Sequence, residues 1–188
     1  MHDDTGGGGP GRAAIIAALV VAVAAIGAVL AIAATRRTPV APVAIAGVPA
    51  PQAESAECRA LMATLPERLG EFTRAAAAEP VPPGAAAWRG SGEDDVGDPV
   101  ILRCGLDRPA EFVVGTPLQM VDDVQWLRLA DGSGNRPDSE RSTWVSVDRP
   151  VYIALTLPAG SGPAPIQTLS EVIARTMPAM PIRPAPAR

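Results

Sequence analysis

Two clusters of carboxylates are the densest groups of side chains in the sequence that could do chemistry. The first comprises Glu93, Asp94 and Asp95, with Asp98 close behind them and Pro99 next. Several carboxylates in one loop could bind calcium, but this segment lacks the twelve-residue pattern of an EF-hand. We interpret the segment as a solvated acidic loop and expect no metal site.

The second cluster is the adjacent pair Asp122 and Asp123, which lies near Trp126. Most enzymes that cleave glycosidic bonds use a pair of carboxyl groups that flank the bond. Successive residues of a strand point to opposite faces, so an adjacent pair does not face one substrate. We therefore expect no catalytic residue in this cluster.

Trp88, Trp126 and Trp144 are three of only six aromatic residues in the chain. Exposed tryptophans could stack on sugars or peptides, but in so small a domain we expect these rings to pack in the core. Arg103 lies beside Cys104 and could pair with an anion. We expect it to be an exposed arginine on a strand.

The only histidine is His2, close to the N-terminus, so imidazole chemistry is excluded from the folded domain. This excludes Ser-His-Asp triads, Cys-His pairs and the usual catalytic zinc sites. The net charge is −4, and Arg36-Arg37 is the only adjacent pair of basic residues. Nucleic acid would require a basic patch, so we expect no nucleic-acid ligand, no cofactor and no enzymatic activity.

Two cysteines, Cys58 and Cys104, permit one intramolecular bridge, and their spacing fits neither a CxxC redox motif nor a zinc knuckle. Cys58 falls on a predicted helix and Cys104 at the end of a predicted strand, a pair that a disulfide can join. Closing this loop would contribute about 4 kcal/mol. The alternative is two reduced, buried cysteines in a cytosolic domain. We expect the bridge.

Residues 13–34 form an unbroken apolar run without a charged residue. As a helix the run is about 33 Å long, which matches a hydrocarbon core of about 30 Å. A cleaved signal peptide is the alternative, but its apolar run is shorter and follows a basic segment. Here the preceding segment is acidic and glycine-rich. We predict a transmembrane helix over residues 13–34, after a short cytoplasmic tail of residues 1–12.

The charges that flank this helix do not decide its orientation. Arg12 and the N-terminal amino group lie on one side, and Arg36 and Arg37 lie on the other, which is close to a tie under the positive-inside rule. A disulfide would decide the orientation, because disulfides persist only in oxidising compartments. We therefore predict a single-pass protein of the cytoplasmic membrane, with its N-terminus inside and its C-terminal domain extracytoplasmic.

The rest of the chain divides into three predicted parts. Residues 35–53 are rich in Pro and Ala, and the uncharged stretch 38–52 predicts an extended spacer with a reach of about 45 Å. Residues 54–177 form the extracytoplasmic domain. Residues 178–188 contain four prolines and predict a disordered tail.

Hydrophobic periodicity predicts an α+β fold for the domain, an antiparallel sheet flanked by N- and C-terminal helices. We expect a short helix from about Ser55 to Ala63, and a second over residues 65–78 with Pro66 in its first turn. A last helix is expected over residues 165–176. The predicted strands are 86–89, 99–104, 111–114, 124–129, 142–148 and 151–157.

Several residues together resemble the actinobacterial domain-of-unknown-function family 3515, small membrane-anchored or secreted proteins. They are Cys58, Leu65-Pro66, Ala87-Trp88, Arg103-Cys104-Gly105, Pro109, Trp126, Arg149 and Val151-Tyr152. The resemblance covers about residues 54–176, with one departure, because Arg89 stands where a glycine is expected after the tryptophan. It implies a membrane anchor and a paired cysteine, and it carries over no catalytic residue.

These observations favour a non-enzymatic accessory or binding module of the cell envelope. Its partner would be an envelope protein or a cell-wall component. The alternative is a wall-directed hydrolase or transferase that uses carboxylates alone. A cytoplasmic signalling domain would require the inverted orientation.

Overall fold

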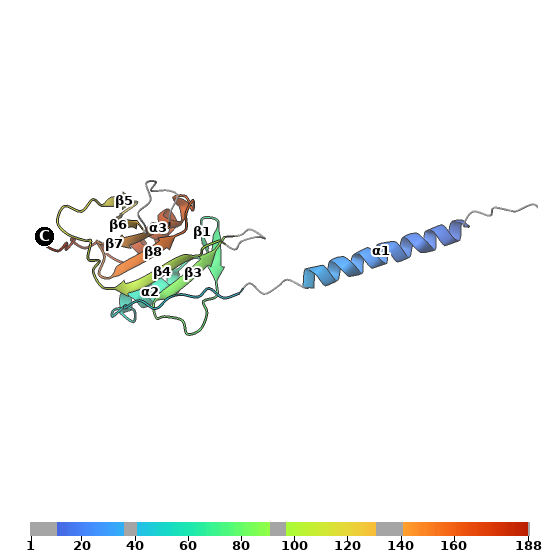
Figure 1. The fold of residues 1–188 in the computed structure, drawn as a ribbon, viewed down its shortest axis with the longest axis horizontal. Coiled ribbons are helices and arrows are strands. Elements are labelled where there is room, and N and C mark those ends of the chain that lie inside the picture. Colours follow the sequence, from blue (N-terminus) through green and yellow to red (C-terminus); the bar gives the residue numbers. More distant parts are fainter. Residues whose placement is uncertain (1–10, 36–40, 91–96, 131–140, 188) are drawn as a thin grey trace, which may run out of the picture. The chain divides into compact units, whose positions relative to one another are not determined.

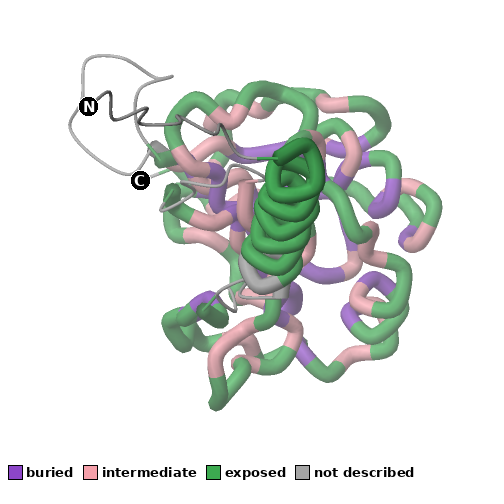
Figure 2. The backbone as a smooth tube through the Cα atoms, turned by 90° about the vertical axis from the view of Figure 1, so that its right-hand side faces the viewer, coloured by how far each residue is buried: buried purple, intermediate pink, exposed green. Residues whose placement is uncertain are grey.

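The computed structural model describes residues 11–35, 41–90, 97–130 and 141–187 in two compact units, Met1–Val40 and Ala41–Arg188. The first unit contains helix α1 (Arg12–Thr35), whose residues from Arg12 to Ala31 are exposed (Figure 2). The helix is long and apolar enough to cross a membrane, although an N-terminal signal sequence would pass the same test. The predicted apolar helix is therefore confirmed.

An eight-stranded antiparallel sheet forms the centre of the second unit (Figure 1). Its strands are β1 (Arg68–Leu69), β2 (Phe72–Ala75), β3 (Ala85–Arg89), β4 (Val100–Leu106), β5 (Gln119–Val121), β6 (Val124–Ala130), β7 (Ser142–Ser146) and β8 (Tyr152–Leu157). The spatial order is β1-β2-β3-β4-β8-β7-β6-β5. Each half of the sheet is thus a run of consecutive strands, and the halves join where β4 pairs with β8.

Two helices, α2 (Ala56–Thr64) and α3 (Ala164–Thr176), pack on one face of this sheet and enclose the main core. Alternate residues of the strands point into this core, as the period of two requires. Trp88 and Trp126 are completely buried there. Their indole N–H groups donate to the Pro66 carbonyl and the Ser170 hydroxyl. The predicted α+β class and the packing role of these two tryptophans are confirmed.

The opposite face of the sheet is covered on one half by an N-terminal strap, residues 41–47. Val43 and Ile45 are buried there against the small side chains of Ala85 and Ala87. The Val43 N–H donates to the Ala76 carbonyl, and its own carbonyl accepts from Ala78. The prediction of a spacer over residues 35–53 is therefore wrong for its second part. Residues 41–53 belong to the domain, because alanines on β3 leave room for this strap.

The C-terminal segment also packs on the domain, although its prolines predict disorder. The Met180 N–H donates to the Asp148 carbonyl, and Ala185 exchanges backbone hydrogen bonds with Phe112 and Val114. Phe112 is buried beneath with Leu127 and Val147 in a core cluster of its own. The prediction of a disordered tail is wrong for residues 178–187. The N–H groups of Met180 and Ala185 bond to carbonyls of loops that are remote in sequence.

Two predicted elements are also wrong. Residues 65–78 form the hairpin of β1 and β2 rather than a helix, and Gly70 turns the chain between these strands with a φ of +60°. Residues 111–114 form no strand and contribute a single bridge, Val113 to Ala185. The sequence does not predict strand β5, because Gln119 and Met120 are both exposed and the strand lacks the usual alternation of buried and exposed residues.

Gly105 is predicted to tolerate no side chain. It interrupts the pairing of β4 with β8, has a φ of +86° and accepts a hydrogen bond from the Gln52 N–H. A Cβ here would overlap the backbone of Gln52 and Ala53. We expect Gly105→Ala to lower the free energy of unfolding by about 3 kcal/mol, from backbone strain and overpacking together.

Gly115→Ala is the matched control for this variant. Gly115 has a similar φ of +89°, but nothing lies within 4 Å of the position that a Cβ would occupy. Strain alone then remains, and we expect a loss of about 1 kcal/mol. Urea denaturation of the purified full-length protein measures both values. Equal losses in the two variants would contradict the close approach of residues 52–53 to β4.

Candidate functional site

A cavity of about 690 Å³ opens beside edge strand β5. It lies on the face of the sheet that carries α3, near the end of β6 and the start of β7. Its size falls within the range of small-molecule sites, about 300–1,000 Å³. Three parts of the chain surround it: a stacked pair on β6 and β7, the β5–β6 hairpin, and the segment that leads into α3.

The stacked pair consists of Arg128 on β6 and Trp144 on β7, which are directly opposite in the antiparallel ladder. The guanidinium carbon of Arg128 lies 5.4 Å from the centroid of the Trp144 ring. This cation–π contact contributes on the order of 0.5–1 kcal/mol. The Trp144 indole N–H donates to the Ser142 hydroxyl at 3.1 Å. The stack therefore fixes the orientation of Arg128 at the cavity.

The β5–β6 hairpin forms the second part and contains Asp122 and Asp123 in its two-residue turn. Asp122 has a φ of +48°, a conformation that aspartate tolerates better than most residues. Asp122 lines the cavity, and Asp123 is not among the lining residues. The structure therefore does not bring these carboxylates together as a pair around one ligand.

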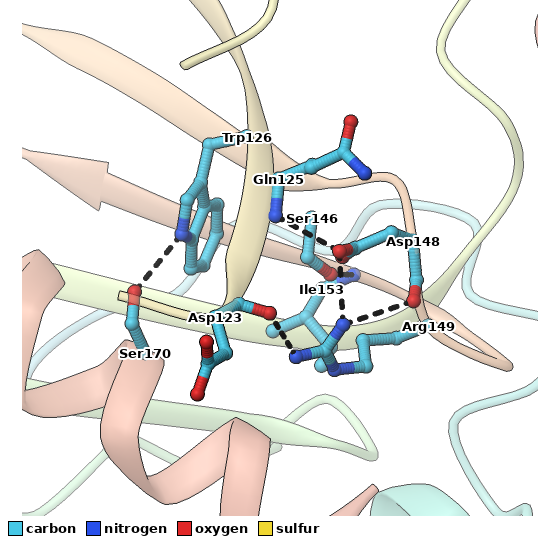
Figure 3. Close-up of polar contacts among 8 residues, drawn as sticks. All are labelled: Asp123, Gln125, Trp126, Ser146, Asp148, Arg149, Ile153 and Ser170. Carbon is cyan, nitrogen blue, oxygen red and sulfur yellow. Dashed lines mark hydrogen bonds and ion pairs between the residues drawn. The ribbon is translucent and has the colours of Figure 1, made fainter. Parts of the chain in front are cut away.

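A buried ion pair holds this hairpin against the turn between β7 and β8 (Figure 3). Arg149 Nη2 donates to the Asp123 carbonyl at 2.6 Å, and Arg149 Nη1 lies 2.9 Å from Asp148 Oδ2. The same carboxylate oxygen accepts from the Gln125 N–H at 3.1 Å. Burial raises the pKa of Asp148 above its ordinary value, while the Gln125 N–H and the charge of Arg149 act in the opposite direction.

The third part is the segment 158–163 together with the first turn of α3. Gly160 and Gly162 have positive φ values, which let this segment bend over the end of β8. Ser161 comes from the bend, and Ile166 and Gln167 from α3. The cavity thus combines apolar surface with hydroxyl, amide, guanidinium and carboxylate groups, a composition suited to reversible binding.

The structure places the other predicted site residues elsewhere. Glu93, Asp94 and Asp95 lie outside the described residues, and Asp98 pairs with Arg141 at 2.5 Å on the surface. Within the described ranges, no three His, Cys, Asp or Glu residues are grouped as metal ligands.

Arg103 is half-buried and is not the exposed strand arginine that the sequence predicts. Its Nη2 donates to the Ala46 carbonyl of the segment that covers β3, and burial lowers the pKa of its guanidinium. Arg103 therefore fastens this segment to the sheet.

The disulfide joins Cys58 on α2 to Cys104 on β4, with 5.7 Å between their Cα atoms. The predicted bridge is confirmed. It clamps a helix to the central strand of the sheet, and both cysteines are completely buried. Its role is to stabilise the scaffold, since neither cysteine lines the cavity.

The family described as "Protein of unknown function (DUF3515)" matches residues 19–182, most of the chain. The chain belongs to this family. No curated protein and no solved structure matches it. The DUF3515 description assigns no activity, so a function has to be inferred from the geometry of this chain.

Most of the residues on which the sequence resemblance to DUF3515 rests stabilise the scaffold. The two cysteines form the bridge, Pro66 accepts from Trp88, and Arg149 holds the β5–β6 hairpin. None of them lines the cavity. Sequence reasoning missed the cavity residues Gln119, Ser161 and Gln167, because only the fold brings β5 and the start of α3 together.

Proposed function

We propose that this protein is a non-enzymatic binding module of the cell envelope. Helix α1 anchors it in the cytoplasmic membrane, and the disulfide-bonded domain lies on the outer side. The observation that carries the proposal is the cavity beside β5, in which hydrogen-bonding groups line a scaffold held rigid by a disulfide and a buried ion pair. The ligand is a cell-wall component or part of another envelope protein.

The disulfide supports the outward orientation, because such bonds persist in oxidising compartments. An engineered thiol tests it, since Cys58 and Cys104 are too buried to label. We expect Val114→Cys, at a position 59% exposed, to react with a membrane-impermeant maleimide in intact cells. Thr5→Cys, in the predicted cytoplasmic tail, should react only after permeabilisation. The reverse pattern would place the domain in the cytosol.

Binding is favoured over the carboxylate-dependent hydrolase or transferase by the number of acidic groups. Asp122 is the one carboxylate that the described residues bring to the cavity. Glycoside hydrolysis needs two carboxyl groups, about 5–9.5 Å apart, on either side of the bond. The polar groups at the cavity are instead suited to holding a ligand.

Photo-crosslinking in living cells tests the binding role. Gln119 lines the cavity, is exposed and lies opposite Trp126 in the ladder, so a benzoylphenylalanine at this position would face a bound ligand. We expect ultraviolet light to convert the full-length protein into a defined adduct. Val114, at 59% exposure and outside the cavity, is the matched control and should give none. Identical patterns from both positions, or no adduct under several growth conditions, would reject the proposal.

A further inference from the structure

The outer edge of β5 offers backbone groups to a further strand, because β5 is the last strand of the sheet. Its neighbour Gln125 uses its backbone N–H and C=O toward Asp148 and Val147, on the side away from β5. Gln125 is opposite Met120 in the ladder, so Met120 turns its own N–H and C=O away from β6. Among the described residues, none bonds to these two groups. They are one donor and one acceptor at the open edge.

The cavity lies directly beside this backbone. Gln119 is opposite Trp126, which is buried under α3, so the Gln119 side chain points to the face that carries this helix. Val121 points the same way, because side chains alternate along a strand. The Met120 side chain points to the opposite face and is 64% exposed. Met120 still lines the cavity, so its backbone borders the cavity, and one wall is an open strand edge.

A polypeptide that pairs antiparallel with β5 would satisfy these backbone groups and reach the cavity at the same time. One of its residues would lie opposite Met120 and exchange both hydrogen bonds with it. The residues before and after that one would direct their side chains to the cavity side of the sheet. Main-chain bonds combined with pockets for alternate side chains are the usual way in which a sheet edge recognises a peptide.

The lining of the cavity favours apolar side chains at those two positions. Leu157 on β8 and Ile166 on α3 are buried and line the cavity, together with the partly buried ring of Trp144. A volume of about 690 Å³ leaves room for both side chains. Gln119 and Gln167 line the cavity and are exposed, and their amides can bond to other N–H and C=O groups of the peptide.

A second copy of this chain is a poorer occupant of the same edge. If two β5 strands paired around a two-fold axis, Met120 would pair with its equivalent, and Gln119 and Val121 would flank it on the cavity side. Val121 already packs against the core of its own copy, so it could not fill the cavity of the other. A separate peptide has side chains that are free to enter the cavity.

We propose that the cavity and the outer edge of β5 bind an extended segment of another polypeptide, which pairs antiparallel with β5. Apolar side chains of this segment enter the cavity from the two positions that flank the residue opposite Met120. This inference rests on the proposed binding function and names its ligand class.

A display library of random short peptides, selected on the full-length protein in nanodiscs, tests the proposal. We expect the selected peptides to share two apolar residues separated by one position. Fluorescence anisotropy of a synthetic copy then gives the affinity. Serine in place of either apolar residue should weaken binding about tenfold, because an apolar contact in the cavity is lost.

Met120→Pro tests the backbone contact. This change removes the N–H that donates to the peptide, and the bonds between β5 and β6 stay, since Met120 makes none of them. Proline is tolerated on an edge strand whose nitrogen faces solvent. We expect Met120→Pro to bind the peptide about fivefold more weakly. Met120→Ala keeps the N–H, so it is the matched control and should bind nearly as well as the wild type.

Methylation of the peptide nitrogens tests the same contact without a change in the protein. A methyl group on the nitrogen of the residue between the two apolar ones should abolish binding, because this N–H donates to the Met120 carbonyl. A methyl group on the nitrogen of either apolar residue should have little effect, since these N–H groups point away from β5.

Four outcomes overturn the peptide assignment: no peptide is enriched, the methylated peptides all bind equally, Met120→Pro binds like Met120→Ala, or only oligosaccharides of a glycan array are bound. The crosslinking experiment separates this failure from that of the proposed function. A saccharide adduct at position 119 would keep the binding role and reject the peptide. Absence of any specific adduct at position 119 would reject the binding role itself.

Discussion

Replacement of Cys58 and Cys104 by alanine is expected to lower the free energy of unfolding by about 4 kcal/mol. The two residues are 46 positions apart, so their bond removes much of the freedom of the unfolded chain. Stability of a domain this size is only about 5–15 kcal/mol, which makes the loss a large share of the total. Urea denaturation of the full-length protein in detergent measures the difference.

Reduction provides the control for this prediction. A reducing agent should destabilise the wild-type protein by a similar amount and leave the double alanine variant unchanged, because that variant has no bond to break. A loss below about 1 kcal/mol in the variant would show that the bridge contributes little to stability. The bridge joins α2 to β4, whereas the cavity is lined by β5 to β8 and α3. Ligand affinity of the folded variant should therefore change little.

Sequence patterns predicted the elements whose burial is regular. Helix α1 is apolar from Ala13 to Ala34, and β4 alternates buried Val100, Leu102 and Cys104 with half-buried residues. The pattern failed at residues 65–78, where Leu69 and Phe72 have a spacing that fits a helix. In the structure they are opposite each other across a hairpin, because Gly70 turns the chain between them. Local spacing alone does not distinguish these two arrangements.

The N-terminal strap and the C-terminal segment could not be predicted for a different reason. Residues 41–47 and 178–187 have few local signals, and their order depends on partners more than thirty residues away, such as Ala76 for Val43 and Phe112 for Ala185. The candidate site depends on the same kind of information. The sequence alone indicates Asp122 and Trp144 as residues that could do chemistry, but their position beside Gln167 follows only from the strand order of the sheet.

Asp148→Asn is expected to destabilise the protein by about 3–5 kcal/mol, because it leaves the charge of Arg149 buried without a counterion. The side chains of Arg149 and Asp148 are only 1% and 5% exposed, so water cannot replace the lost carboxylate. Asparagine keeps an oxygen that can accept from the Gln125 N–H, and the shape of the side chain is unchanged. The loss of unfolding free energy therefore reflects the missing charge rather than altered packing. Urea denaturation measures this loss.

A double variant provides the control and links the ion pair to the cavity. Arg149→Met keeps an unbranched chain and removes the charge, so Asp148→Asn with Arg149→Met should cost clearly less than the sum of the single changes. Additive losses would show that the two charges do not stabilise each other.

Arg149 also holds the Asp123 carbonyl, and the adjacent Asp122 lines the cavity. Every variant that lacks Arg149 should therefore bind the cavity ligand more weakly even where its stability is restored, whereas loss of the disulfide should not. This difference separates the residues that position the cavity from those that only stabilise the fold.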